Sequence, residues 1–292
     1  MYSIVIPVYN DFDNLDLLLK DISVKCVRHR PETIILVDDG STEKLSEWFR
    51  FKKNSYSLPI VKTLRIPQSG PAYAVSVGLS KVETPYCFVI DSDVRLEVNT
   101  KSCKHDDPLS VCYWHGEGIE DLSAIGCYLV DSYREDLSYH SVVSKGPLVL
   151  TSEEKNYRIV ETHYNFKVDS IINLALTPVE IVFSLPSSFY MLNMNLFKTL
   201  GGFDDTFAPY GFYLSDYLAR GREKKHQTYL TYETLVFHKK KPKKPKGTKA
   251  IYTEISAQEF HKKWDGNPAW QSNALYKENI LKEVSASDDF NI

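Results

Sequence analysis

Short apolar runs alternate with helical stripes along the first 95 residues of this 292-residue chain. Four of these runs are rich in β-branched residues and short, which is typical of buried strands; they cover residues 3–9, 33–37, 60–66 and 86–90. Between the first two, apolar residues repeat with the spacing of one helix face, at Leu15, Leu18, Leu19 and Ile22. A second helix is predicted over residues 70–79, where Pro71 fits the first turn. The alternation predicts an α/β fold, a mainly parallel sheet with helices on both faces.

The pattern is less regular in the second part of the chain. Strands are expected near residues 122–130, 157–162, 179–193 (interrupted at Pro186) and 230–238. Helical segments are expected at residues 196–200 and 214–220, and residues 103–114 are expected to be irregular. Residues 239–249 contain seven lysines and two prolines, which predicts a loop. Ser256 and Glu259 have the spacing of a capping box, which predicts a C-terminal helix up to about Trp264.

Two acidic clusters follow predicted strands. Asp38 and Asp39 come after residues 33–37, and Asp91 and Asp93 come after residues 86–90. In such sheets ligands bind outside the carboxyl ends of the strands. Carboxylates gathered at one edge are unfavourable unless a cation binds among them. We therefore expect a shared cleft at this edge.

The Asp91-Ser92-Asp93 unit suits a hard divalent cation. Mg²⁺ and Mn²⁺ prefer carboxylate oxygens and accept phosphate oxygens in the remaining positions. A cation held there would neutralise a diphosphate leaving group as a Lewis acid. The sequence thus predicts an Mn²⁺ or Mg²⁺ site, and the alternative is a solvated turn with a capping aspartate.

Several motifs occur in a characteristic order. They are SIVIPVYN at 3–10, ILVDDGSTE at 35–43, a helix beginning at Gly70, FVIDSDV at 88–94 and GGFDDTF at 201–207. Together they resemble the inverting glycosyltransferase family 2 of the GT-A fold, over residues 1–95 and 180–240. The resemblance implies transfer of a sugar from a nucleotide-sugar donor, usually a UDP-sugar, to an acceptor hydroxyl, with a divalent metal. The acceptor expected is a saccharide or glycoconjugate.

The resemblance assigns the donor site to the first two motifs. It implies that Pro7, Val8 and Tyr9 line the nucleoside. It also implies that Asp39 binds the nucleobase through its N3 position, with Asp38 beside it. The alternative for Asp38 and Asp39 is a plain turn between strand and helix.

The resemblance assigns the metal site to the later motifs. Asp93 would be the main metal ligand, and Asp91 would contact the ribose or the metal, with Ser92 in the same donor-binding turn. In several relatives a histidine at a place comparable to His238 completes the metal shell. The alternative for His238 is an ordinary surface or core histidine.

The chain departs from the family pattern at two places. Val75-Ser76 stands where the family usually has Arg-Asn, and Tyr213-Leu214 stands where it commonly has Glu-Asp. The aspartate of that Glu-Asp pair is the family's general base, which takes the proton of the acceptor hydroxyl. The remaining candidates are Asp216, Asp205 and Asp204, unless the base lies within residues 100–180 or is missing. Asp204 and Asp205 could instead cap the chain after the preceding glycines.

Charge and composition limit which kinds of binding partner are expected. The net charge of −3 argues against a surface built as a whole for a polyanion, although the lysine run at 239–249 could meet a diphosphate, an anionic acceptor or nucleic acid. Nucleic acid is possible but not favoured. The start of the chain does not read as a signal peptide and there is no long apolar stretch, so no transmembrane segment and a cytoplasmic location are expected.

We expect one GT-A domain over residues 1–250, followed by a C-terminal helical extension at 251–292. Its Rossmann-like nucleotide-sugar-binding half would cover residues 1–99 and its acceptor half residues 100–250. Three alternatives stay open: a catalytically impaired relative that binds sugar nucleotide or glycan, a glycosyltransferase acting on modified DNA bases, and a sugar-nucleotide nucleotidyltransferase. The last lacks support because Pro7-Val8-Tyr9-Asn10 replaces the glycine-rich turn it would need.

Overall fold

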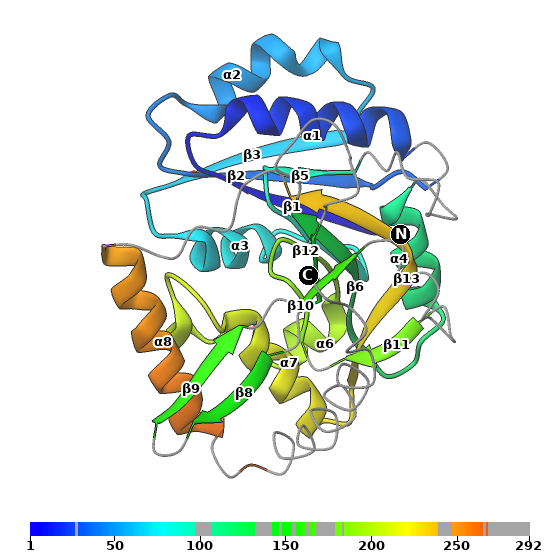
Figure 1. Ribbon diagram of the computed structural model, residues 1–292. Coiled ribbons are helices and arrows are strands. Elements are labelled where there is room, and N and C mark those ends of the chain that lie inside the picture. The colour runs from blue at the N-terminus through cyan, green and yellow to red at the C-terminus, as the bar shows by residue number, and fades with distance from the viewer. Residues whose placement is uncertain are drawn as a thin grey trace.

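A large mixed sheet forms the centre of the molecule in the computed structural model (Figure 1). The residues that the structure describes are 1–26, 29–96, 107–131, 142–145, 148–153, 156–161, 164–167, 179–182, 184–238, 247–264 and 267. The main path of the sheet has the order β10-β7-β6-β12-β4-β1-β2-β3. A separate hairpin pairs β8 (Leu148–Glu153) with β9 (Asn156–Glu161).

The N-terminal part of the sheet is parallel, as predicted. Its strands are β1 (Tyr2–Val8), β2 (Thr33–Asp39), β3 (Ile60–Ile66) and β4 (Tyr86–Ile90). β1 lies between β2 and β4, and β3 extends the sheet beyond β2. Since these strands run the same way, the two aspartates that end β2 and the two that follow β4 reach the same edge.

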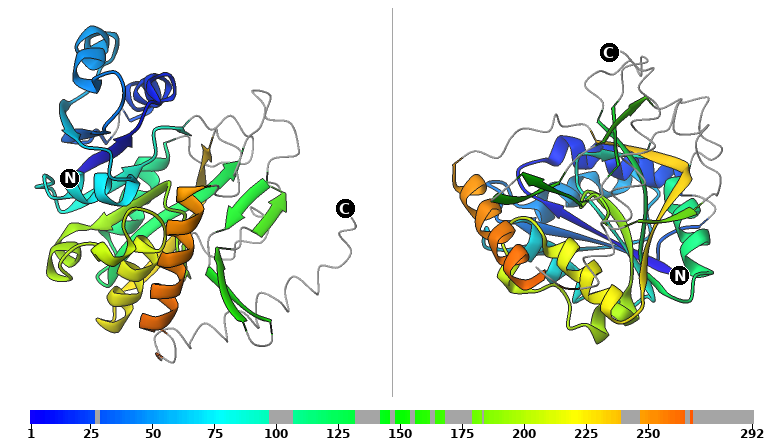
Figure 2. Two further views of the ribbon diagram at one scale, coloured as in Figure 1. Left: turned by 90° about the vertical axis from the view of Figure 1, so that its left-hand side faces the viewer. Right: turned by 60° about the horizontal axis from the view of Figure 1, so that its bottom comes forward.

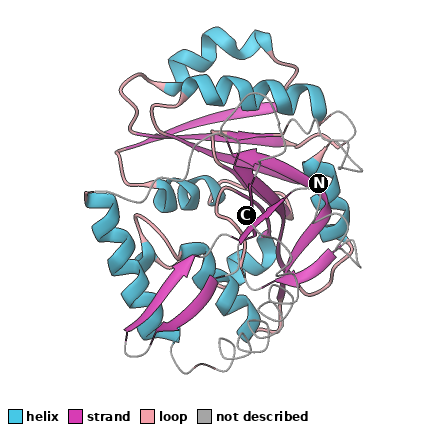
Figure 3. Ribbon diagram, viewed as in Figure 1, coloured by secondary structure: helices cyan, strands magenta, loops and turns pink. Residues whose placement is uncertain are grey.

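Helices cover both faces of this parallel sheet (Figures 1 and 3). They are α1 (Phe12–Lys25), α2 (Leu45–Lys52) and α3 (Pro71–Leu79). Alternate residues of one strand serve the two faces: Ile4 and Ile6 share a core with Leu18 of α1, whereas Val5 shares one with Val75 of α3. All of these apolar side chains are buried, and each contributes on the order of 1.5–3 kcal/mol to folding.

The C-terminal half continues the sheet with antiparallel and parallel neighbours. β12 (Phe189–Asn193) lies antiparallel between β4 and β6 (Leu122–Asp131). The long β13 (Gln227–His238) runs parallel to β6 and antiparallel to β11 (Val179–Val182) and the short β5 (Val94–Arg95). β7 (Val142–Lys145) and β10 (Tyr164–Lys167) complete the far side.

Three helices of the second half, α6 (Met194–Thr199), α7 (Tyr213–Glu223) and α8 (Thr248–Trp264), share one core with α3 and lie together in the two views of Figure 2. Helix α4 (Pro108–Glu117) belongs to the other core, with α1. Short 3₁₀ turns follow α2 (η1, Lys53–Ser55) and precede α7 (η2, Asp205–Phe207). In the described part of the chain, no helix combines the length and the apolar content needed to cross a lipid bilayer.

Two sequence-based expectations were wrong, and one helix had not been expected. Residues 108–117 form helix α4 rather than irregular chain, because the Asp107 carboxylate caps it by accepting the Ser110 N–H at 3.1 Å. Helix α2 was not anticipated. Ser256 does not begin the C-terminal helix: α8 starts at Thr248, and the Ser256 hydroxyl donates to the Tyr210 carbonyl at 2.7 Å.

The lysine-rich segment lies mainly at 239–246, outside the described residues. Its predicted end at 249 already belongs to α8. The domain boundary that we placed at residue 250 also falls inside this helix, whose Phe260 and Trp264 are part of the core.

Candidate active site

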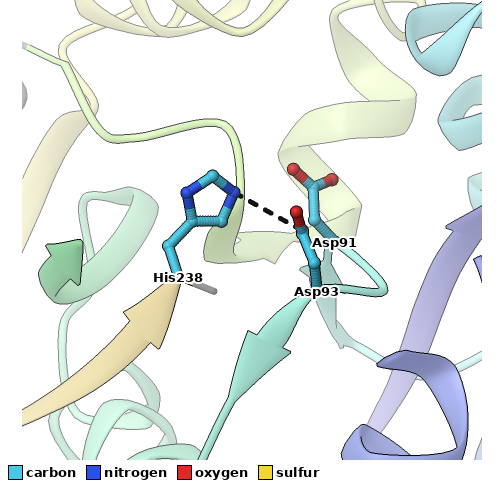
Figure 4. Close-up of side chains that lie close together, drawn as sticks. All are labelled: Asp91, Asp93 and His238. Carbon is cyan, nitrogen blue, oxygen red and sulfur yellow. Dashed lines mark ion pairs between the residues drawn. The ribbon is translucent and has the colours of Figure 1, made fainter. Parts of the chain in front are cut away.

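Asp91, Asp93 and His238 come together at the carboxyl edge of the sheet (Figure 4). One ligand atom from each lies within 4.8 Å of the other two. The His238 Nε2 atom is 3.4 Å from Asp93 Oδ1. Asp93 is buried, while Asp91 and His238 are partly exposed.

Backbone pairing brings these three residues together. β4 ends at Ile90, and a tight turn follows in which the Val94 N–H donates to the Asp91 carbonyl at 3.1 Å. β5 then pairs with the last residues of β13, with His238 opposite Val94. A histidine 145 positions further along the chain is thereby set beside Asp93.

This donor set fits a divalent cation. Two carboxylates suit hard ions, and an imidazole nitrogen is acceptable to Mn²⁺. The partial exposure of Asp91 and His238 leaves a side from which phosphate oxygens and waters can complete the shell.

The Ser92 side chain contacts Asp11 rather than the candidate metal ligands. Its hydroxyl donates to Asp11 Oδ2 at 2.8 Å, and Asn14 Nδ2 donates to Asp11 Oδ1 at 2.8 Å. Ser92 therefore ties the turn to the start of α1. Asp11 directly precedes Phe12, the first residue of α1.

Asp38 holds the loop after β2 in place. Its carboxylate accepts from the Ser41 N–H at 2.8 Å and the Leu45 N–H at 3.3 Å, and it pairs with Arg65 Nη1 at 2.6 Å. Arg65 also donates to the Ser41 carbonyl at 2.7 Å. These contacts account for Asp38 as a structural residue beside the expected nucleobase site.

Asp39 is held by backbone donors. Its two oxygens accept from the Ser69 N–H at 2.7 Å and the Gly70 N–H at 3.0 Å. Burial raises the pKa of Asp39, the two N–H groups offset part of that effect, and the nearby Asp38 charge adds to it. Each carboxylate oxygen can accept a further hydrogen bond, such as one from an imide N–H.

The residues of the first motif, 3–10, change from buried to exposed at the end of β1. Pro7 and Val8 are buried in the sheet, whereas Tyr9 is 46% exposed. Asn10 adopts φ +51° and bridges to the next loop: its N–H donates to Ser41 Oγ at 3.0 Å, and its side-chain oxygen accepts from Thr42. Of Pro7, Val8 and Tyr9, which were expected to line the nucleoside, Tyr9 is the exposed one.

Tyr210, which the sequence analysis did not single out, lies near the expected nucleobase site, close enough to feel the Asp39 charge. Gly70, at φ +90°, accommodates Pro209 so closely that an added Cβ would lie 2.4 Å from the Pro209 Cβ. This contact seats Tyr210 next to the Asp39 carboxylate, and Lys249 Nζ lies 5.3 Å from the centre of the Tyr210 ring. Burial raises the pKa of Tyr210, and Asp39 and Tyr9 add to the effect.

A second aromatic residue approaches the metal cluster from β12. Tyr190 is fully buried, and its pKa is raised well above 10 by burial, then by the nearby Tyr213 and Asp91. Tyr213 stands at a position where family 2 commonly has an acidic residue. Tyr190 thus lies near both Asp91 and Tyr213.

Asp216 is engaged on both oxygens. Oδ2 accepts from Arg220 Nε at 2.8 Å, and Oδ1 binds Trp264 Nε1 at 3.0 Å and Lys263 Nζ at 2.8 Å. The residue has no exposed surface. These contacts join α7 to α8 and favour a structural role.

The other two candidate bases differ in exposure. Asp204 pairs with Lys263 at 2.7 Å and caps η2 by accepting the Thr206 N–H at 2.9 Å. Asp205 begins η2 and is exposed. Of the three aspartates, Asp205 is the one whose surroundings leave the carboxylate open to solvent.

The parallel sheet with an Asp-x-Asp turn at its edge defines the GT-A class of fold. Residues 3–101 match the model of glycosyl transferase family 2, the family that the motifs resemble.

Curated relatives match the same region. The undecaprenyl-phosphate 4-deoxy-4-formamido-L-arabinose transferase of Yersinia enterocolitica is 33% identical over 94 residues, which are 32% of this chain and 29% of the relative. The minor teichoic acid biosynthesis protein GgaA of Bacillus subtilis is 31% identical over 109 residues, 36% of this chain and 24% of the relative. The chain thus spans less than a third of the length of these relatives.

Solved structures match over most of the chain. GalNAc-T7 with UDP, GalNAc and Mn²⁺ superposes with a TM-score of 0.66 at 14% identity, covering 91% of this chain and 48% of that one. The mannosyltransferase PcManGT of Pyrobaculum calidifontis with GDP-Man and Mn²⁺ gives a TM-score of 0.53 at 13% identity, covering 86% and 59%. At these identities the likeness establishes the fold, which is the predicted GT-A fold.

Proposed function

We propose that this protein transfers a sugar from a nucleotide-sugar donor, a UDP-sugar by preference, to an acceptor hydroxyl with the help of a divalent cation. The observation that carries this proposal is the cluster of Asp91, Asp93 and His238 at the carboxyl edge of a GT-A sheet. The complexes of structural neighbours with UDP or GDP-Man and Mn²⁺ support the same assignment.

In this proposal the edge of the sheet is divided between base and diphosphate. Asp39 accepts the imide N–H of uracil, and Tyr9 and Tyr210 flank the nucleoside. Asp91, Asp93 and His238 hold Mn²⁺ or Mg²⁺, which when bound neutralises the leaving diphosphate. Because strands lie about 4.8 Å apart and β1 separates β2 from β4, the two acidic sites are about 10 Å apart.

The general base remains a proposal with three candidates. Direct displacement with inversion needs a carboxylate within hydrogen-bond reach of the acceptor hydroxyl. Asp216 and Asp204 already hold Lys263, so Asp205 has the most accessible carboxylate of the three. We propose Asp205 as the first residue to test, followed by Asp216 and Asp204.

The acceptor is proposed to be a glycan or glycoconjugate. The names of the two curated relatives refer to undecaprenyl phosphate and to teichoic acid. A lipid-linked or polymeric acceptor is consistent with both.

Replacing Asp93 tests the metal site directly. We expect Asp93→Asn to remove most of the Mn²⁺-dependent gain in UDP affinity and to abolish turnover of UDP-sugars, because a neutral amide is a poor ligand for a hard cation. Isothermal titration of UDP with and without Mn²⁺ measures the affinity gain, and release of UDP from UDP-sugars measures the turnover.

Asp13→Asn is the matched control, since Asp13 lies exposed in the first turn of α1. It should bind UDP with Mn²⁺ like the unaltered protein. A donor affinity in Asp93→Asn that still responds to Mn²⁺ as before would contradict the metal site. If the unaltered protein neither binds nor cleaves any UDP- or GDP-sugar, the proposed function itself is wrong.

A further inference from the structure

Helix α8 contacts the loop that carries Tyr210. The Ser256 hydroxyl donates to the Tyr210 carbonyl at 2.7 Å, and a Cβ added to Gly211 would lie 3.8 Å from Thr253 Cγ2, which is ordinary van der Waals contact. α8 and α3 lie on the same side of the sheet and share one core (Figure 1). The backbone of Tyr210 and Gly211 is thus held by one face of α8.

The same loop contacts the turn before α3. Pro209 lies against Gly70, and the Ala72 N–H donates to the Pro209 carbonyl at 3.4 Å. Gly70 in turn donates its N–H to Asp39, the residue that we propose binds the nucleobase. One short loop therefore connects α8 to the nucleobase end of the candidate site.

Lys249, in the first turn of α8, brings a positive charge to this contact. Its Nζ atom lies 5.3 Å from the centre of the Tyr210 ring, which is within the range of a cation–π interaction, and its side chain is exposed. In the part of the chain that the structure describes, Lys249 forms no ion pair with a carboxylate. Lys263 at the other end of α8 differs, because Asp204 and Asp216 both bind it. The ammonium group of Lys249 is thus open to a negatively charged ligand.

A nucleoside phosphate would bring negative charge to an edge of the sheet that already carries carboxylates. Arg65, on the neighbouring strand β3, is paired with Asp38 at 2.6 Å, so its charge is already compensated. At Asp91 and Asp93 the proposed divalent cation compensates the diphosphate, but these residues follow β4, two strands away from Asp39. A cation at the nucleoside end would offset the remaining repulsion, and an ammonium group binds a phosphate more strongly than a neutral donor does.

We propose that Lys249 is a nucleotide-binding residue whose ammonium group contacts the phosphate nearest the ribose. The inference rests on the proposed function and gives α8 a direct part in donor binding. The Tyr210 ring keeps the lysine beside the nucleoside, because the ammonium group lies over its face. If Lys249 acted only by steadying this ring, its loss would weaken every uracil-containing ligand equally. A contact to phosphate instead affects only the phosphorylated ligands.

Titration of the full chain with uridine, UMP and UDP in a chelator tests the proposal. We expect Lys249→Gln to weaken the binding of UMP and UDP roughly tenfold, the effect of losing one hydrogen bond to a charged group, and to leave uridine binding unchanged. Added salt should reduce the difference between the two proteins, because ions screen the charge of an exposed lysine. Lys249→Arg, which keeps the charge, should retain most of the affinity for UMP.

Lys262→Gln is the matched control, because Lys262 is another exposed lysine of α8 and lies 3.8 Å from Glu259. It should bind all three ligands like the unaltered protein, and both glutamine variants should keep their melting temperature. Unchanged UMP affinity in Lys249→Gln, or an equal loss for uridine and UMP, would overturn this inference and leave the proposed function intact. If the unaltered protein bound neither UMP nor UDP, the uridine preference of the proposed function would be wrong as well, so the two failures are distinguishable.

Discussion

Asp39, the residue that we propose binds the nucleobase, is held in one position by its neighbours. Its carboxylate is fixed by two N–H groups from the turn before α3, and the φ of +90° at Gly70 lets Pro209 close over that turn. The side chain therefore loses little further freedom when a base binds. Tyr210 directly follows Pro209, which forms the contact with Gly70.

At the residue scale, variants can test the proposed nucleobase contacts independently of the metal site. We expect Asp39→Asn to weaken UDP binding without metal roughly ten- to a hundredfold, which is the value of one hydrogen bond to a charged group, about 1.5–3 kcal/mol. Tyr210→Ala should weaken it as well, whereas Tyr210→Phe should keep most of the affinity if the ring provides the contact. Titration of UDP in a chelator measures all three variants.

Tyr73→Ala is the control for loss of an exposed tyrosine, since Tyr73 is 44% exposed on α3. It should bind UDP like the unaltered protein. Unchanged UDP affinity in both Asp39→Asn and Tyr210→Ala would contradict the proposal that the nucleobase binds at this end of the sheet.

At the element scale, α7 and α8 are joined by one buried carboxylate. Asp216 is held by Arg220 from α7 and by Lys263 and Trp264 from α8. Removing one member of a buried ion pair leaves an uncompensated charge, which costs about 3–5 kcal/mol. We expect Asp216→Asn to lower the free energy of unfolding by an amount of this order, measured by urea denaturation.

This variant also separates the two roles considered for Asp216. If Asp216 anchors the helices, stability falls and the loss of turnover at low temperature is modest. If it is the general base, turnover falls by about 10²–10⁴ while stability is nearly unchanged. Asp205→Asn, which alters an exposed aspartate of the GGFDDTF motif, should leave stability intact in either case.

The elements that the sequence predicted well are those whose apolar pattern is local. β1 to β4, α1 and α3 have clear periodicity, and each lies within a few residues of its predicted bounds. Helix α4 was missed because its apolar residues face inward nearly all round, so it has no polar stripe. The start of α8 was missed because lysines and a proline precede it, and because its buried face begins only at Ser256.

The candidate site was predictable to the extent that its residues follow strands. Asp39, Asp91 and Asp93 are close to strand ends in the sequence, so their edge could be inferred. The pairing of β5 with β13 that sets His238 beside Asp93 depends on contacts between distant segments. Tyr210 gave no signal, because its place depends on Pro209 packing against Gly70.

At the scale of the whole molecule, two ion-pair networks far apart in the sequence respond to acid in the same way. Burial alone would raise the pKa of Asp16, but hydrogen bonds from Lys20, Tyr56 and Lys52 outweigh it and lower the pKa from 3.8 to about 2. At Asp204 burial likewise acts upward, and hydrogen bonds from Lys263 and Thr206 lower the pKa from 3.8 to about 2.

A carboxylate whose pKa is lower in the folded state stabilises that state above the pKa of the unfolded chain. The contribution of both groups is therefore complete above about pH 4 and is lost as the pH falls towards 2. We expect the free energy of unfolding, measured by urea titration, to decline through this window. The Asp16→Asn, Asp204→Asn double variant should be less stable at pH 6 and should lose less stability on acidification. The ion pair of Asp16 connects α1 with the end of α2, and that of Asp204 connects η2 with α8. If acidification lowered the free energy of unfolding equally in both proteins, these two pairs would carry no acid-sensitive stability, and other carboxylates would control the acid response.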